Sequence, residues 1–267
     1  MPQSPTQTAA MPVLFVGHGS PMNILADNTY TQALEALQKS LPKPQAILSI
    51  SAHWVTSKTL IQSTLHPKTV YDFGGFPEAL YQVQYSLKGS PELATRVAQL
   101  TEGKAIPADS WGIDHGTWSV LRHLYPEGEI PVTQLSLNAN LNYREHYALA
   151  QKLIPLRSEG ILILGSGNIV HNLREVDWAE NSLTPGWAQQ FDASVQKSLD
   201  TRAWEELLDP IHSFGASSFQ RAHPSIEHYL PLLYSLGAAG DGSNLRYFYE
   251  GFQNATISMR SCIFYSD

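Results

Sequence analysis

Three of the ten histidines in this 267-residue chain come shortly after apolar runs of four or five residues. A neutral imidazole carries a lone pair at physiological pH and is a good metal ligand. Three or four such ligands leave a coordination position open for substrate, which separates a catalytic metal site from a closed structural one. The three histidines are His18 after the run 13–16, His53 after the run 46–50 and His171 after the run 161–164.

Other patterns of reactive residues are absent from the sequence. The stretch 17–21, Gly-His-Gly-Ser-Pro, is not a nucleophile elbow, because its second glycine takes the place of the nucleophile. No Walker loop, Gly-x-Gly-x-x-Gly or His-Glu-x-x-His occurs. The single cysteine, Cys262, excludes an internal disulfide and a four-cysteine metal site. The histidines at 66, 123, 146 and 212 have no comparable context, and we expect them to be exposed to solvent.

Composition excludes several classes of protein and partner. Hydrophobic residues make up 43% and charged residues 15% of the chain, which excludes a disordered chain or a coiled coil. The net charge is −7 and no block of Lys and Arg occurs, so we expect no nucleic-acid partner. No apolar run approaches the roughly 18 residues of a membrane helix, and the N-terminus lacks the pattern of a signal peptide. We therefore expect a cytoplasmic protein without a membrane partner.

Short buried strands alternate with helices along the chain. Apolar runs bounded by Gly and Pro are typical of strands buried on both faces, and a fourth such run covers 132–137. Apolar spacing and possible caps predict helices over 30–41, 91–100, 142–156, 186–208 and 226–236, and two further strands within 246–265. This alternation predicts one α/β domain. We assign residues 1–11 to a disordered N-terminal tail and 12–267 to the domain.

The predicted strands explain how distant histidines can meet. In open α/β sheets, ligands bind outside the carboxyl ends of the strands. We therefore expect His18, His53 and His171 to converge at one edge of the sheet and to bind a metal ion there. His228 is a weaker candidate, because it falls in the first turn of the helix predicted over 226–236.

Six motifs, in order along the chain, resemble the DODA-type class III extradiol aromatic ring-opening dioxygenases. This family includes the 4,5-DOPA dioxygenase extradiol-like proteins of bacteria and plants, and the resemblance covers nearly the whole chain from about Met11. The motifs are GHGSPMN (17–23), SAHW (51–54), YDFGGFP (71–77), WGIDHGTW (111–118), GSGNIVHNL (165–173) and EHYLPLLY (227–234).

The resemblance implies a single-domain α/β sandwich with a central mixed, mostly parallel sheet flanked by helices. It also implies one divalent metal ion per chain, with Fe(II) for catalysis and Zn(II) as a common occupant of the purified protein. Matched motif by motif, His18, His53, His171 and His228 resemble the metal-site residues. His115 resembles a second-sphere acid/base that faces the substrate.

Two assignments stay open at this point. Extradiol Fe(II) sites usually present two histidines and one carboxylate. Glu227 is next to His228, and adjacent helical positions point about 100° apart, so one of the two is expected to face the metal. His171 has two alternative roles, as a ligand in the zinc form or as a catalytic base in the iron form.

The reaction implied is the cleavage of a DOPA-like catechol ring beside its two hydroxyls, with both atoms of O₂ entering the product. The expected partners are thus a catechol-type small molecule and O₂, and the expected assembly is a monomer or a small homo-oligomer. Two alternatives use the same histidines. One is a zinc-dependent hydrolase, and the other is a catalytically silent metal-binding relative.

Overall fold

The computed structural model describes residues 10–179 and 182–266. Most of the tail predicted over 1–11 therefore lies outside the described residues. Met11, at the end of that segment, is buried, and its backbone N–H donates to the carbonyl of Arg157 at 2.9 Å. Ordered contacts with the rest of the molecule thus begin no later than Met11.

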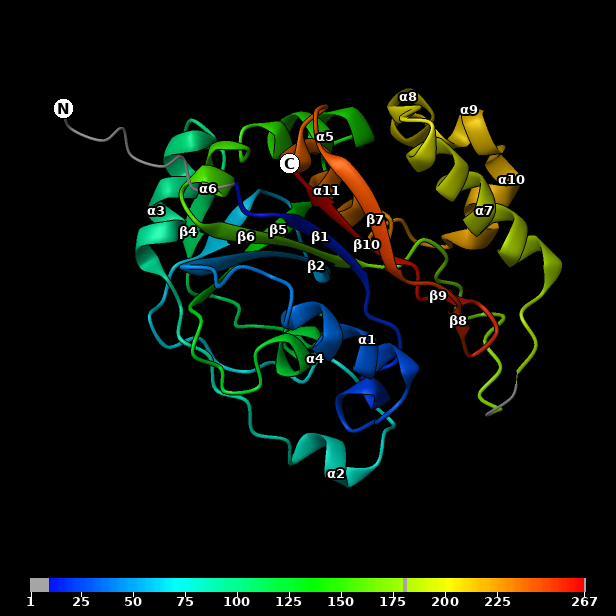
Figure 1. The fold of residues 1–267 in the computed structure, drawn as a ribbon, viewed down its shortest axis with the longest axis horizontal. Helices are drawn as coiled ribbons and strands as arrows, with labels where there is room; N and C mark the ends of the chain where they lie inside the picture. The colour runs from blue at the N-terminus through cyan, green and yellow to red at the C-terminus, as the bar shows by residue number, and fades with distance from the viewer. Residues whose placement is uncertain (1–9, 180–181, 267) are drawn as a thin grey trace.

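The centre of the molecule is an eight-stranded sheet in the order β4-β3-β5-β2-β6-β1-β10-β7 (Figure 1). The four central strands β5, β2, β6 and β1 are parallel, whereas β10, β7 and the β3–β5 pair are antiparallel. The predicted mixed, mostly parallel sheet is confirmed. Its strands are β1 (Val13–Gly17), β2 (Ala46–Thr56), β3 (Leu60–Gln62), β4 (Ile106–Ala108), β5 (Val132–Asn138), β6 (Ile161–Gly167), β7 (Asn244–Tyr249) and β10 (Ser261–Tyr265). A separate two-stranded sheet pairs β8 (Phe252–Gln253) with β9 (Ile257–Ser258).

Helices cover both faces of the sheet (Figure 1). Alternate side chains of β1 enter two hydrophobic cores, Val13 and Phe15 on one face and Leu14 and Val16 on the other. Such burial on both faces explains why the central strands read as continuous apolar runs. The helices are α1 (Thr29–Gln38), α2 (Glu78–Tyr81), α3 (Pro91–Leu100), α4 (His115–Leu124), α5 (Tyr143–Gln151), α6 (Pro155–Ser158), α7 (Gly186–Asp200), α8 (Trp204–Leu208), α9 (Pro210–Phe214), α10 (Ala216–Ala222) and α11 (Leu230–Ala239), with a 3-10 helix at Pro21–Ile24.

Helix starts agree with the local capping chemistry better than helix ends do. The capping box predicted at Asn142 is present, with Asn142 Oδ1 accepting from the Glu145 N–H and Glu145 accepting from the Asn142 N–H. The single helix predicted over 142–156 is two helices, because Pro155 cannot continue the first one. The segment 186–208 likewise divides into α7 and α8.

Two site residues lie on different elements from those predicted. β2 runs on to Thr56 through a register irregularity after Ile50, so His53 lies within the strand and not in the loop after it. The last predicted helix begins at Leu230, so His228 lies in the turn before α11 rather than in its first turn. Pro231 explains the shift, because proline is favoured in the first turn of a helix and excluded from the interior.

Candidate metal centre

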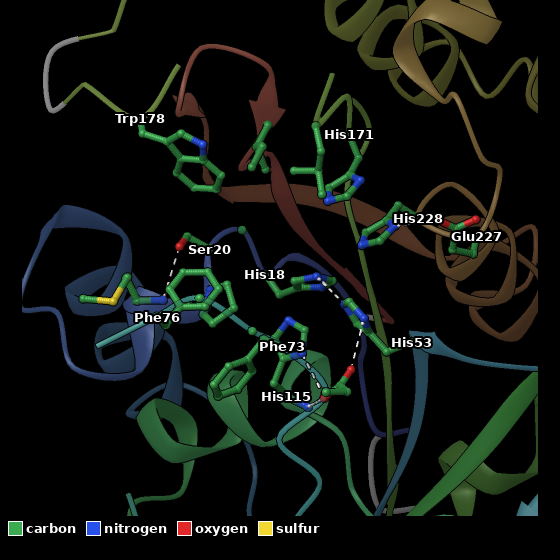
Figure 2. A pocket seen from close by; sticks show the side chains of 18 of the residues that line it. His18, Ser20, His53, Phe73, Phe76, His115, His171, Trp178, Glu227 and His228 are labelled. Atoms are coloured by element: carbon green, nitrogen blue, oxygen red, sulfur yellow. Dashed lines mark hydrogen bonds and ion pairs between the residues drawn. The ribbon is translucent and has the colours of Figure 1, made fainter. Parts of the chain in front are cut away.

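Five histidines from five separate segments line one cavity of about 1030 Å³ (Figure 2). His18 directly follows β1, His53 lies in β2, and His115 opens α4. His171 follows β6, and His228 precedes α11. The ring centroids are 5.0 Å apart for His18 and His53, 4.0 Å for His53 and His115, and 5.3 Å for His18 and His228. His171 stacks on His228 at 3.5 Å. All four predicted metal-site residues and His115 are therefore brought together.

Glycine at position 167 allows the close approach of two of these segments. A Cβ atom at Gly167, the last residue of β6, would lie 2.3 Å from the backbone oxygen of His228. The same oxygen accepts the N–H of Asn168 at 2.9 Å. The Gly-Ser-Gly-Asn segment at the end of β6 thus holds the turn that carries His228 close to this strand.

The partners of His18 assign its tautomer. Its Nδ1 lies 2.9 Å from Ser166 Oγ. The hydroxyl of Ser166 donates its one proton to the carbonyl of Gly116 at 2.5 Å, so it accepts a proton from His18. Nδ1 of His18 is therefore the protonated nitrogen, and Nε2 carries the lone pair.

Asp72 lies between two of the histidines. Its Oδ2 is 3.2 Å from Nδ1 of His53, and its Oδ1 is 3.0 Å from Nδ1 of His115. Oδ1 also accepts the backbone N–H of His115 at 2.9 Å. Burial opposes ionisation, but the close contacts with the His115 and His53 rings outweigh it and lower the pKa of Asp72. These distances place Nδ1 of both rings at the carboxylate, which favours a proton on each Nδ1 and a lone pair on each Nε2.

Two lone pairs face each other at the centre of the cluster. Nε2 of His18 and Nε2 of His53 are 3.1 Å apart, and with a proton on Nδ1 of each ring neither Nε2 has a proton to share. Nε2 of His228 is buried with no hydrogen-bond partner among the described residues. Converging neutral imidazole nitrogens are the donor set that a divalent metal ion binds, so this cluster fits a metal ion.

Burial keeps four of the five histidines neutral. Desolvation lowers the pKa of His18, His53 and His228 well below the ordinary value for histidine, and neighbouring histidines lower it further. Burial likewise lowers the pKa of His171 to about 4. At neutral pH these imidazoles are unprotonated, which is the form that binds a metal.

Two details bear on the ligand set predicted from sequence. Of the neighbours Glu227 and His228, the His228 ring lies against His18 and His53, whereas Glu227 Oε1 lies 3.4 Å from the outer nitrogen, Nδ1, of His228. In addition, one ligand atom from each of His18, His53 and His115 lies within 4.8 Å of the other two. His115 is thus as close to the first two histidines as a third ligand would be.

Sequence reasoning missed two buried carboxylates that lie near these histidines. Asp72 is in the motif YDFGGFP, which we singled out for its aromatic residues only. Asp114, the N-cap of α4, is buried and accepts from Ser51 Oγ at 2.7 Å and from Trp111 Nε1 at 3.2 Å, and burial raises its pKa to about 6. Side chains of this kind are recognisable only by their contacts, because no spacing rule connects residue 72 with residues 53 and 115.

Aromatic residues form the wall of the cavity next to the histidines. Phe73 and Phe76 line the cavity. The rings of Phe73 and His115 pack edge to face, with their centroids 5.4 Å apart. Trp178 lies farther from the cluster, on the loop after β6 (Figure 2). Arg174 also lines the cavity, and its guanidinium has no partner among the described residues. The cavity therefore combines a polar floor with an apolar wall.

A sheet edge that presents clustered neutral histidines to an open cavity defines a metal-dependent α/β enzyme. The chain belongs to the family described as the catalytic LigB subunit of aromatic ring-opening dioxygenase, whose profile matches residues 11–264. It is 42% identical over 253 residues to the 4,5-DOPA dioxygenase extradiol of Escherichia coli (strain K12), covering 94% of this chain and 93% of that protein. It is 38% identical over 259 residues to the protein of the same name from Beta vulgaris, covering 94% and 96%.

A solved structure agrees with the fold. An uncharacterized protein from Escherichia coli K12 superposes with a TM-score of 0.82 at 38% identity, covering 95% of this chain and 99% of that chain. The predicted family is confirmed, and the protein is an oxidoreductase of the extradiol dioxygenase class. Among the described residues, no helix is long and apolar enough to cross a membrane.

Proposed function

We propose that the protein opens the ring of a catechol that carries a charged side chain, with DOPA as the first substrate to test. The observation that carries this proposal is the pair of facing Nε2 atoms of His18 and His53 at the floor of an open cavity. In this proposal His18, His53 and His228 hold the metal ion, with His171 beside it. Fe(II) supplies the redox chemistry that O₂ requires and zinc does not.

In this proposal, His115 and His171 carry out the proton transfers. A catechol hydroxyl loses its proton more readily beside a bound metal ion, and a neutral imidazole within reach can accept that proton and return it later. His115 is 4% exposed, and its ring lies between Phe73 and His53, where a planar ring against the aromatic wall can reach it. His171 stacks on His228 and borders the same cavity.

The size and charges of the cavity support a substrate larger than catechol. Pockets of about 300–1,000 Å³ hold drug-sized ligands, and this cavity of about 1030 Å³ leaves room beyond one aromatic ring. Arg174 supplies a guanidinium that suits a carboxylate. Glu227, which accepts from Ser225 Oγ at 2.7 Å, supplies a carboxylate that suits an ammonium group. An amino-acid side chain on the catechol carries both the carboxylate and the ammonium group that these two residues suit.

We further propose a cytoplasmic enzyme that acts as a monomer or a small homo-oligomer.

The test is anaerobic loading with Fe(II), followed by exposure to a panel of substituted catechols in air. We expect one O₂ consumed per catechol and a coloured ring-opened semialdehyde as product. Zinc-loaded protein and a catechol methylated on one hydroxyl serve as controls, and both should be inert. Turnover by the zinc form under argon would favour the hydrolase alternative. A panel left untouched by the iron form would favour the silent relative.

The side-chain preference has a separate test. Arg174→Gln removes the guanidinium and retains a polar side chain of similar length. We expect KM for DOPA to rise about tenfold or more, since a charge-assisted hydrogen bond contributes roughly 1.5–3 kcal/mol. KM for dopamine, which lacks the carboxylate, should stay unchanged. Equal effects on the two substrates would reject Arg174 as the carboxylate-binding residue.

A further inference from the structure

Among the described residues that line the cavity, Asp72 is the one carboxylate that lies against two histidines of the cluster at the same time. Its Oδ2 and Nδ1 of His115 are both buried, and neither has a hydrogen-bond partner among the described residues. Buried polar atoms are satisfied in folded proteins. The facing Nδ1–H groups of His53 and His115, at 3.2 and 3.0 Å, are the groups that can satisfy this carboxylate.

We propose that Asp72 is a positioning residue that sets the tautomers of His53 and His115 together, and that it thereby makes Nε2 of His53 a metal ligand. This inference rests on the proposed function only in taking His53 as a ligand. A carboxylate that accepts from the outer nitrogen of a ligating histidine fixes the ring and its tautomer, and its loss typically weakens metal binding 10–100-fold. Sharing one carboxylate couples the ligand His53 to the acid/base His115.

The two oxygens of Asp72 are not equivalent. Oδ1 accepts the backbone N–H of His115 at 2.9 Å, and that N–H donates in every state of the site. In an Asp72→Asn variant the amide oxygen is therefore held on the His115 side. The amide NH₂ then faces Nδ1 of His53, which must become an acceptor. The proton of His53 moves to Nε2.

In the metal-free protein, the altered tautomer of His53 has a hydrogen-bond acceptor for its moved proton. Nε2 of His53 is 3.1 Å from Nε2 of His18, so the moved proton forms a hydrogen bond with the lone pair of His18. The Asp72→Asn protein should therefore fold as well as the wild type while its zinc site is lost. A residue with a merely structural role would lower the melting temperature instead.

The experiment measures tautomers and zinc affinity, without turnover. Long-range ¹H–¹⁵N spectra of the metal-free wild type at pH 7.5 should show the Nδ1–H tautomer at both His53 and His115. In Asp72→Asn, His53 should switch to Nε2–H while His115 keeps Nδ1–H. The Kd for Zn²⁺, measured by chelator competition, should rise about 10–100-fold. Asp27→Asn, at an exposed aspartate outside the cavity, is the matched control and should change neither quantity.

Two results overturn the proposal. One is an Nε2–H tautomer at His53 or His115 in the wild type, which stays measurable even if the variant does not fold. The other is a folded Asp72→Asn protein whose Kd for Zn²⁺ lies within twofold of the wild type. Neither measurement uses iron, O₂ or a catechol. A failure of the proposed ring opening is therefore distinguishable from a failure of this inference.

Discussion

At the scale of single residues, the chemistry of the site depends on which imidazole nitrogen carries a proton. Ser166 Oγ accepts a hydrogen bond from Nδ1–H of His18, and Asp72 lies against the Nδ1 atoms of His53 and His115. All three rings therefore present an Nε2 lone pair. Because His115 lies as close to His18 and His53 as a ligand would, its role as an acid/base needs a direct test.

His115→Ala separates the two roles of this residue. If His115 moves protons and His228 completes the ligand set, the variant should keep one metal ion per chain. Turnover should fall by on the order of 10²–10⁴-fold, the usual contribution of a positioned acid/base. Elemental analysis and O₂ uptake measure the two quantities.

His228→Ala is the counterpart of that variant and should lose the metal. The reverse pattern, with metal lost in His115→Ala and kept in His228→Ala, would show that His18, His53 and His115 form the ligand set. Wild-type turnover by folded His115→Ala protein would reject both roles.

At the scale of elements, the site depends on how closely the end of β6 approaches the turn before α11. A Cβ atom at Gly167 would lie 2.3 Å from the backbone oxygen of His228, a distance that real side chains do not tolerate. Gly167→Ala should therefore move the backbone of His228, weaken metal binding and lower the melting temperature. Zinc titration and thermal unfolding of the metal-free protein measure the two effects.

Gly186→Ala is the matched control for this substitution. Gly186 opens α7, and a Cβ atom there meets nothing within 4 Å. Its replacement by alanine should leave zinc affinity unchanged and raise stability slightly, by about 0.4–1 kcal/mol, through the entropy of the unfolded chain. Zinc affinity unaltered in Gly167→Ala would contradict the proposed position of His228.

At the scale of the whole molecule, buried neutral histidines outside the site make stability depend on pH. Burial lowers the pKa of His146 to about 4 and that of His223 to about 3. Both folded-state values lie below the unfolded value of about 6.5, so the unfolded chain binds more protons below that pH. The stabilisation is complete above pH 6.5 and is lost as pH falls toward 4 and then 3.

We expect each of these histidines to make the free energy of unfolding fall by about 1.4 kcal/mol per pH unit near pH 5. Urea unfolding of metal-free protein at pH 7, 6 and 5 measures this slope. His146→Gln, which retains an acceptor for the Tyr234 hydroxyl, should reduce the slope. His212→Gln, at a side chain that is 84% exposed, should leave it unchanged. An unaltered slope in His146→Gln would contradict the burial of a neutral His146.

His146 also shows where local patterns stop being informative. We expected His66, His123, His146 and His212 to be exposed, and His66 and His212 are. His146 is buried against Tyr234 of α11, and His123 is mostly covered, with Nε2 2.8 Å from the carbonyl of Asn23. Burial of a polar side chain on a helix depends on which other element covers it, and that neighbour lies far away in the chain.

The sequence by itself determined the parallel centre of the sheet and the candidates for the metal site. Short apolar runs bounded by Gly and Pro specify strands locally, and β1, β2, β5 and β6 all begin where these runs begin. His18, His53 and His171 were identifiable because the carboxyl ends of parallel strands meet at one edge. The role of His115 and the inclusion of His228 came from the motifs of the family, since their own spacing is uninformative.

Only the tertiary structure decided which nitrogen atoms face one another and what holds them. Asp72 meets His53 and His115 across separations of 19 and 43 residues, and Ser166 meets His18 across 148. The tertiary structure also placed His53 inside β2 and His228 before α11. It directed the ring of His228, rather than the side chain of Glu227, toward the cluster. The physical reason is that strand and helix patterns arise from contacts within a few residues, whereas tautomers and ligand geometry depend on hydrogen bonds between segments that only folding brings together.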